Sequence, residues 1–315
     1  MSIFIPKAKQ PPFRKTLISA CMAFSTLALS AGSTQASTLA GSKPNILYIV
    51  ADDLGYSDLS AFGGEIRTPN IDSLVKNGRI LSNHHVSTVC AVTRSMLYSG
   101  TDHHLVGEGT MGAPNDERHG LPGYEGYLNN HSLSIAELLR DGGYHTYIAG
   151  KWHLGSLISS PVNKTPDQWG FENSFTLLGG AASNHFGHDT AANKTYTENG
   201  QYISLPATDT NGQPWYDTNV YTQKLISYID AHIGDGKPFA AFATYTSPHW
   251  PLQAPEPWLS QYAGWYDAGY DAVRNRRLLR QKQLGIVPND YTVASQPLPD
   301  KVTASAATAY ITVRC

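Results

Sequence analysis

Three short apolar runs, each followed by charged or histidine side chains, are the feature that most constrains how this chain can fold. The runs cover residues 45–51, 144–149 and 239–244. Short apolar runs bounded by turn residues indicate buried β-strands. Segments with helical patterns lie between them, so strands and helices alternate along the chain. This alternation predicts an α/β fold in which helices cover both faces of one sheet.

Capping and turn residues indicate where helices begin and end. Thr68 followed by Pro69 is typical of a helix start, and Gly78 is typical of a helix end. Residues 156–215 are rich in Gly, Asn, Thr and Ser, which predicts loops. The sequence shows no internal repeat and no interdomain linker, so we expect one domain. Further helices are expected over residues 91–98, 132–141 and 217–233, and a further strand over residues 79–86.

The polar residues after the three apolar runs are candidates for a functional site, because ligands in α/β proteins bind at the carboxyl ends of strands. These residues are Asp52 and Asp53, then Lys151 and His153, and finally His249. Adjacent carboxylates suit Ca²⁺ or Mg²⁺, which prefer oxygen ligands, although they are also common in turns. A single histidine is more often structural than functional. It is therefore the convergence of three strand ends that favours a site.

Cys90 lies where a loop passes into the helix expected over residues 91–98, and Arg94 follows one turn later. A helix N-terminus attracts anions through its free N–H groups. Arg94 shares a helix face with Cys90 and offers planar donors that suit a tetrahedral oxyanion. This short segment therefore combines a nucleophile, an anion site and a cation.

The composition excludes several other classes of protein. Charged residues make up 15% of the 315 residues and hydrophobic residues 41%, which argues against intrinsic disorder. The formal net charge of -2 gives no basic surface for a phosphate backbone, so we expect no nucleic acid partner. The three cysteines, at positions 21, 90 and 315, are too few for a disulfide framework or a zinc site built from cysteine clusters.

Residues 1–36 have the pattern of a secretory signal peptide. The first 15 residues hold basic side chains and no acidic one, residues 16–31 are apolar, and Thr34-Gln35-Ala36 offers small residues to signal peptidase. The apolar run is too short for a transmembrane helix, which predicts a periplasmic or secreted protein with no stable membrane anchor. A lipoprotein that carries its lipid on Cys21 is the alternative, but the apolar run continues past that cysteine.

Several motifs, in order along the chain, resemble those of the sulfatase family within the alkaline phosphatase superfamily. Residues 90–97 resemble the signature Cys-x-Pro-Ser/Thr-Arg of that family, residues 150–155 match its second signature, and residues 247–251 resemble its third conserved stretch. The similarity extends from about residue 43 to about residue 300. The chain looks most like the N-terminal part of bacterial arylsulfatases.

The resemblance implies a large mixed, mostly parallel central sheet with helices on both faces. It also implies hydrolysis of a small-molecule sulfate ester, with Cys90 oxidised to formylglycine by a formylglycine-generating or anaerobic sulfatase-maturing enzyme. One hydroxyl of the hydrated aldehyde attacks sulfur, and the second then expels sulfate. A divalent cation, commonly Ca²⁺ and alternatively Mg²⁺, offsets the negative charge. By position, its ligands in this chain would be Asp52, Asp53 and Cys90.

The resemblance assigns roles to the other four candidate residues. Arg94 would hold the formylglycine and the sulfate group, and Lys151 would bind sulfate, since such donors stabilise charge on the transferred group. His153 would act as base toward the hydrated aldehyde. His249 would contact sulfate or protonate the leaving oxygen, which is a general-acid role.

Two departures from the family pattern bear on these expectations. Val92 stands where the family has Pro or sometimes Ala, within the signature that the maturing enzyme reads. The second pair of family metal ligands, Asp-Asn, has no counterpart after His249. We therefore expect residues 37–315 to form the N-terminal domain of a sulfatase, C-terminally truncated. A phosphonate or phosphate-ester hydrolase of the same superfamily, and an inactive truncated fragment or pseudoenzyme, are the alternatives.

Overall fold

The computed structural model describes residues 41–155, 165–180, 185–187 and 196–293. The chain divides into two units, Met1–Pro44 and Asn45–Cys315, and all the helices and strands below belong to the second. The signal peptide expected over residues 1–36 lies outside the described residues. Within the ranges described, no helix combines the length and the apolar character that crossing a membrane requires.

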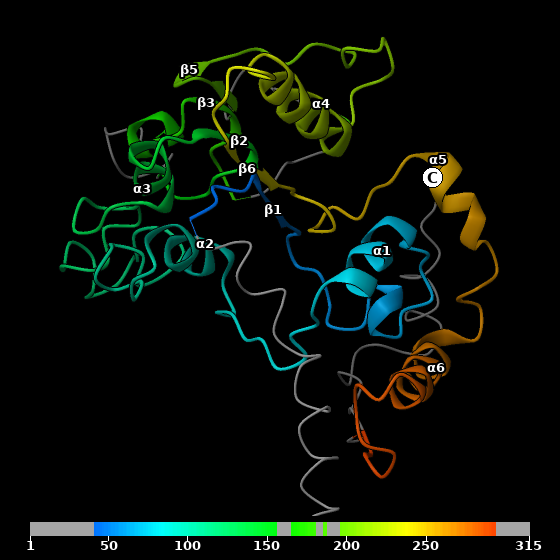
Figure 1. Ribbon diagram of the computed structural model, residues 1–315. Helices are drawn as coiled ribbons and strands as arrows, with labels where there is room; N and C mark the ends of the chain where they lie inside the picture. The colour runs from blue at the N-terminus through cyan, green and yellow to red at the C-terminus, as the bar shows by residue number, and fades with distance from the viewer. Residues whose placement is uncertain (1–40, 156–164, 181–184, 188–195, 294–315) are drawn as a thin grey trace, which may run out of the picture. The chain divides into compact units, whose positions relative to one another are not determined.

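A mixed six-stranded sheet organises the second unit (Figure 1). The strands lie in the order β1-β6-β2-β3-β4-β5. The pairs β1–β6, β6–β2 and β2–β3 are parallel, whereas β3–β4 and β4–β5 are antiparallel, so the expected mostly parallel sheet is confirmed. The bounds are β1 Ile46–Val50, β2 His145–Lys151, β3 Asn173–Leu177, β4 Tyr196–Glu198, β5 Gln201–Tyr202 and β6 Phe239–Thr244.

Helices pack on both faces of the sheet, as expected. Successive side chains of a strand point to opposite faces, so Ile148 and Phe242 belong to one buried cluster and Tyr147 and Ala241 to another. The first cluster includes side chains from α2 and α3, and the second includes side chains from α4. Because both faces are covered, β2 and β6 are fixed and can orient the residues at their ends. The bounds are α2 Cys90–Ser99, α3 Ile135–Asp141 and α4 Asp217–Asp230.

Strand β1 forms an edge of the sheet, and among the described residues its strand partner is β6 alone. Leu47, Tyr48 and Ile49 are 56%, 40% and 51% exposed. The sequence predicts a buried strand here, and this prediction is wrong for the side chains. The physical reason is that the described residues supply a strand neighbour on one side only. The apolar character of β1 is therefore not matched by its burial.

Two other predictions from local pattern are wrong. Residues 79–86 form no strand, and Ile80 and Leu81 are exposed there. Residues 156–215 are not all loops, since they contribute β3, β4 and β5. These short strands are stabilised by pairing with β2 and with each other, which a local sequence pattern does not show. Helix α3 begins later than expected, after a capping box at Ser134, and α4 ends earlier than expected.

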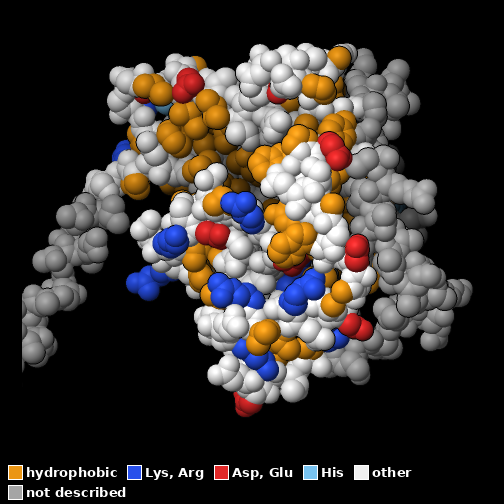
Figure 2. All heavy atoms as spheres, turned by 90° about the vertical axis from the view of Figure 1, so that its right-hand side faces the viewer, with side chains coloured by type: hydrophobic (Ala, Val, Ile, Leu, Met, Phe, Trp, Pro, Cys, Tyr) orange, Lys and Arg blue, Asp and Glu red, His pale blue; other side chains and the backbone are white. Residues whose placement is uncertain are grey.

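Of the remaining helices, η1, α1 and η2 lie between strands in the chain, whereas α5, η3 and α6 follow β6. Arg277 donates to Asp58 at 2.5 Å and to Glu65 at 2.7 Å, which joins α6 to the loop that precedes α1. Figure 2 shows hydrophobic side chains interspersed with Lys and Arg on the side of the molecule where α5 and α6 lie, and Trp258 and Trp265 are 64% and 52% exposed. The bounds are η1 Ser60–Phe62, α1 Pro69–Asn77, η2 Pro166–Trp169, α5 Glu256–Leu259, η3 Ser260–Tyr262 and α6 Gly269–Gln283.

Gly150 sets how closely β2 and β6 approach each other next to Lys151. Its φ is +125°, and a Cβ atom at this position would lie 1.9 Å from the backbone oxygen of Thr244. No side chain fits at that distance without moving one of the two strands. The glycine is therefore required for the close strand pairing that places Lys151.

We expect Gly150→Ala to lower the free energy of unfolding by about 3 kcal/mol, because it overpacks a rigid pair of strands. Gly100→Ala is the matched control: Gly100 also has positive φ, at +63°, but nothing lies within 4 Å of an added Cβ. Its cost should be about 1–2 kcal/mol, from backbone strain alone. Urea unfolding of both variants measures the difference, and equal midpoints would contradict the packing argument.

Candidate active site

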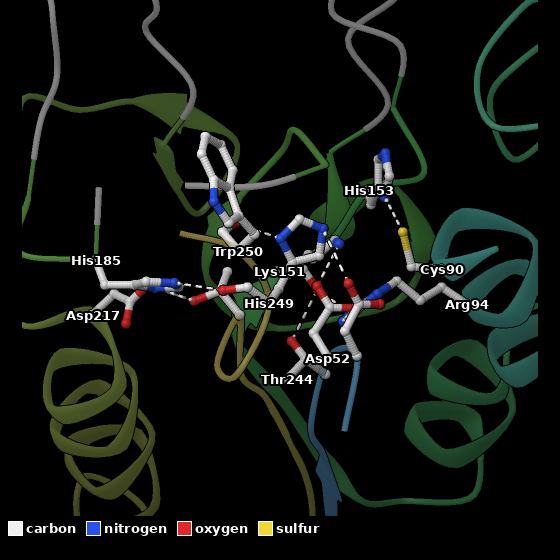
Figure 3. Close-up of polar contacts among 12 residues, drawn as sticks. Asp52, Cys90, Arg94, Lys151, His153, His185, Asp217, Thr244, His249 and Trp250 are labelled. Atoms are coloured by element: carbon white, nitrogen blue, oxygen red, sulfur yellow. Dashed lines mark hydrogen bonds and ion pairs between the residues drawn. The ribbon is translucent and has the colours of Figure 1, made fainter. Parts of the chain in front are cut away.

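A buried ion cluster joins the ends of β1 and β2 to helix α2 (Figure 3). Lys151 Nζ donates to Asp52 Oδ2 at 2.5 Å, and Arg94 Nη2 lies 3.5 Å from Asp52 Oδ1. All three residues are at most 4% exposed. Arg94 Nη1 also donates to the backbone oxygen of Lys151 at 2.6 Å, while its Nη2 makes no hydrogen bond. Two cations therefore share one carboxylate, which leaves one positive charge for an anion.

Cys90 is the first residue of α2 and lies beside His153. Its Sγ is 3.3 Å from His153 Nδ1. His153 follows β2 with a φ of 58°, and the backbone of Gly180 lies close to its other ring nitrogen, since a Cβ there would be 2.5 Å from Nε2. The imidazole is therefore confined between Cys90 and Gly180.

The pKa of His153 is strongly lowered. Burial disfavours the charged imidazolium, and the positive charges of Lys151 and Arg94 act in the same direction, which lowers the pKa to about 3. The imidazole is neutral at neutral pH. A neutral ring has a lone pair, so Nδ1 can accept a hydrogen bond from a group at position 90.

His249 comes from the turn after β6 (Figure 3), and its ring faces Asp53. Its Nε2 lies 3.5 Å from Asp53 Oδ2, and its Nδ1 donates to the backbone oxygen of Trp250 at 2.6 Å, which fixes the direction of the ring. The same turn meets β1, since the backbone N–H of Asp52 donates to the oxygen of Ser247 at 3.2 Å. The ends of β1, β2 and β6 therefore lie together, and all seven candidate residues lie at this edge of the sheet.

The candidate metal ligands suit a cation by chemistry but are engaged otherwise in this structure. Carboxylate oxygens are what Ca²⁺ and Mg²⁺ prefer, yet both oxygens of Asp52 face Lys151 and Arg94. Among the described residues, the three His, Cys, Asp or Glu side chains that have donor atoms within 4.8 Å of one another are Asp102, His103 and His104. They do not include the candidate ligands. A cation at Asp52 would have to compete with the Lys151 ammonium.

A profile of the family described as Sulfatase matches residues 44–310 of the chain. The chain belongs to the sulfatase family. This confirms the resemblance that the motifs indicate.

Individual relatives and solved structures agree. The sulfatase chain is 41% identical over 262 residues to an uncharacterized sulfatase of Schizosaccharomyces pombe, covering 79% of this chain and 45% of that protein. It is 38% identical over 263 residues to an arylsulfatase of Klebsiella aerogenes, and this match covers 82% of this chain and 53% of that protein. The crystal structure of Ps i-CgsB aligns with a TM-score of 0.58 at 26% identity, covering 78% of this chain and 56% of that one. The chain spans about half the length of the curated relatives it matches.

Sequence reasoning missed two buried residues at this edge, His185 and Asp217. His185 Nε2 lies 3.0 Å from the backbone oxygen of His249, and its Nδ1 lies 2.7 Å from Asp217 Oδ2. Asp217 begins α4, where an acidic residue is ordinary helix chemistry, and His185 follows no apolar run. The sequence gives no local signal for either residue, because only the folded chain brings them to His249.

We expect the His153 imidazole of the metal-free chain to stay neutral well below pH 6.5, its ordinary pKa, as measured by NMR titration. Since the unfolded chain then binds a proton that the folded chain does not, stability should fall as the pH decreases from 6.5 toward 3, by up to about 1.4 kcal/mol per pH unit. Lys151→Met should raise this pKa by removing a positive neighbour. Lys224→Met, which removes a lysine paired with Glu198 instead, should not. Titration near 6.5 in the parent would contradict the assignment.

Proposed function

We propose that this chain carries the sulfate-ester hydrolysing site of a sulfatase, with a formylglycine formed from Cys90. The observation that carries the proposal is the contact of Cys90 with a neutral His153 beside the cluster of Arg94, Lys151 and Asp52. A residue at position 90 there has a base at hydrogen-bond distance and two buried cations close by. The 38% identity to an arylsulfatase supports the same activity.

The roles of the side chains follow from their positions. A formylglycine at position 90 would supply the nucleophile and a divalent cation would supply positive charge against the sulfate group. His153 Nδ1 would accept a proton from the group at position 90. Arg94, whose Nη2 makes no hydrogen bond here, would donate to a sulfate oxygen, as would Lys151. His249, in the turn after β6, would protonate the leaving oxygen.

The electrostatics favour a bound cation. Arg94, Lys151 and Asp52 carry one net positive charge, and the neighbouring carboxylate of Asp53 offsets it, so the four groups together are neutral. A sulfate monoester is an anion, and the transferred group gains negative charge on its oxygens in the reaction. Stabilisation of that charge in a water-poor site is usually the largest part of catalysis. We propose that Ca²⁺, or Mg²⁺, held by Asp52, Asp53 and the group at position 90, supplies the missing charge.

The proposal includes export and maturation. A signal peptide over residues 1–36 would direct the chain to the periplasm or outside the cell, as a mature domain that starts at Ser37. A maturing enzyme would act on Cys90 through the signature around it. Val92 is 4% exposed within α2, so the side chain at this position packs against its neighbours in the folded chain. Val92 therefore bears on recognition by the maturing enzyme as well as on packing.

The proposed function is tested by co-producing the chain with a maturing enzyme and assaying a chromogenic aryl sulfate with Ca²⁺. Mass spectrometry of the tryptic peptide that contains Cys90 should show an aldehyde in place of the thiol, and Val92→Pro should increase the converted fraction. Cys90→Ala should abolish any hydrolysis. Faster turnover of a matched aryl phosphate or phosphonate ester would favour the alternative hydrolase. An intact thiol in both the parent and Val92→Pro would favour an inactive fragment.

We expect the turnover of residues 37–315 on an aryl sulfate to lie well below about 1 s⁻¹, a rate ordinary for enzymes. The reason is that Asp52 and Asp53 with one oxygen at position 90 give a cation fewer than the six to eight ligands usual for Ca²⁺. A rate of 1 s⁻¹ or more would overturn this expectation.

Cation binding gives a second measurement. By calorimetry, Ca²⁺ should bind residues 37–315 weakly, and Lys151→Met should tighten binding by releasing Asp52 from its ion pair. Lys224→Met removes the same charge away from the site and is the matched control, which should change little. Tight binding by the parent, or equal effects of the two variants, would contradict the competition between Lys151 and the cation.

A further inference from the structure

A buried histidine–carboxylate pair supports the turn that carries His249 (Figure 3). His185 is 1% exposed and Asp217 is fully buried. His185 Nδ1 and Asp217 Oδ2 are 2.7 Å apart, and the backbone N–H of Asp217 donates to the backbone oxygen of His185 at 2.9 Å. The two residues therefore hold each other through both side chain and backbone.

Both ring nitrogens of His185 face acceptors. Nδ1 faces the carboxylate of Asp217, and Nε2 faces the backbone oxygen of His249 at 3.0 Å. Two acceptors require two N–H donors, so the ring satisfies both only as the imidazolium. The Thr246 hydroxyl donates to the same oxygen of Asp217, which favours the ionised carboxylate.

The surroundings of His185 fit this charge state. Burial disfavours the imidazolium, but the hydrogen bond to Asp217 outweighs it, and the pKa of His185 is raised above 6.5. Among the described residues, the charged group in contact with the ring is Asp217, from α4. The His185 ring also has the backbone oxygens of His249 and Pro251 and the hydroxyl of Thr246 as neighbours.

The turn is held from several sides, and His185 holds the part nearest the His249 ring. Ser247 bonds to Thr218 of α4 through the two side-chain hydroxyls at 3.1 Å, and its backbone oxygen accepts from Asp52. The His185 backbone N–H donates to Gln253 Oε1 at 2.9 Å. The carbonyl that accepts from His185 Nε2 belongs to His249 itself, so this donor helps to fix the direction of that peptide.

We propose that His185 and Asp217 form a buried ion pair that positions His249 toward Asp53 and the anion site. They are positioning residues, since neither touches the candidate reacting groups. The inference rests on the proposed function in one respect, namely that His249 acts on a sulfate group bound at this site. Loss of the Nε2 proton would leave the part-buried His249 carbonyl without this donor, and an acceptor shielded from water without its partner costs more than a hydrogen bond gains.

Two substitutions separate the two donors of the ring. Gln places an N–H near the position of Nε2 and keeps the bond to His249, whereas Asn places one near Nδ1 and keeps the bond to Asp217. Both lose one hydrogen bond, so both should lower stability similarly. His185→Asn should shift the NMR resonances of the His249 ring and weaken binding of inorganic sulfate about tenfold, or about 1.4 kcal/mol. His185→Gln should move the resonances far less and keep sulfate affinity within about twofold.

His145→Gln is the matched control. His145 is also buried between acceptors, Glu172 and Asp235 at 2.7 Å each, but it begins β2 at the other end of the strand from Lys151. It should lower stability without moving the His249 resonances. Equal effects of His185→Gln and His185→Asn on His249 would overturn the proposal.

If the variants fail to fold, nitrogen NMR of the unsubstituted chain tests the ion pair through the protonation of the His185 ring. Both ring nitrogens of His185 should carry protons at neutral pH and lose one only in alkaline solution. A singly protonated ring at neutral pH would refute the ion pair. These readouts need no turnover, so an inactive chain in the aryl sulfate assay would count against the proposed function and not against the positioning of His249.

Discussion

The carboxylate of Asp52 is the group on which the rest of the site depends. It lies directly after β1, and it pairs with Lys151 at the end of β2 and with Arg94 in α2. Neither cation is more than 2% exposed, and a buried charge without a partner is strongly destabilising. One carboxylate therefore allows two cations to remain inside the protein, at the place where they can bind an anion. Parallel pairing of β1, β6 and β2 makes this possible because it brings their carboxyl ends to one edge.

The sequence predicts the parts of the site that have local signals. Lys151 and His249 follow apolar runs, and Cys90 precedes a helical pattern, so their common location follows from fold class alone. The sheet is less predictable, since β3 carries the polar sequence Asn173–Leu177 and forms because it pairs with β2. His185 is the extreme case. Its importance comes from contacts with residues 32 and 64 positions away, and no local pattern encodes those.

Two histidines at this edge have pKa values displaced in opposite directions. His153 is near Lys151 and Arg94, which repel its proton, and His185 is bonded to Asp217, which attracts it. Burial acts against the charged form of both. It is the largest cause of the lowered pKa of His153, whereas the hydrogen bond to Asp217 outweighs it at His185. The site can therefore hold a neutral base and a fixed cation at the same pH.

The pairing of β1 with β6 also sets the order of events as the chain is made. Ile46 pairs with Ala240, so the first strand waits for almost the whole described chain before its only described strand neighbour exists. At ribosomal rates of about 5–20 residues per second, the roughly 150 residues between Cys90 and β6 take about 8–30 s to be made. During that interval the sheet edge at Asp52 is not yet formed, because β6 lies between β1 and β2. The segment around Cys90 is then not yet packed against the completed sheet. The maturing enzyme proposed to act on Cys90 would have its best access then, before the thiol lies beside His153.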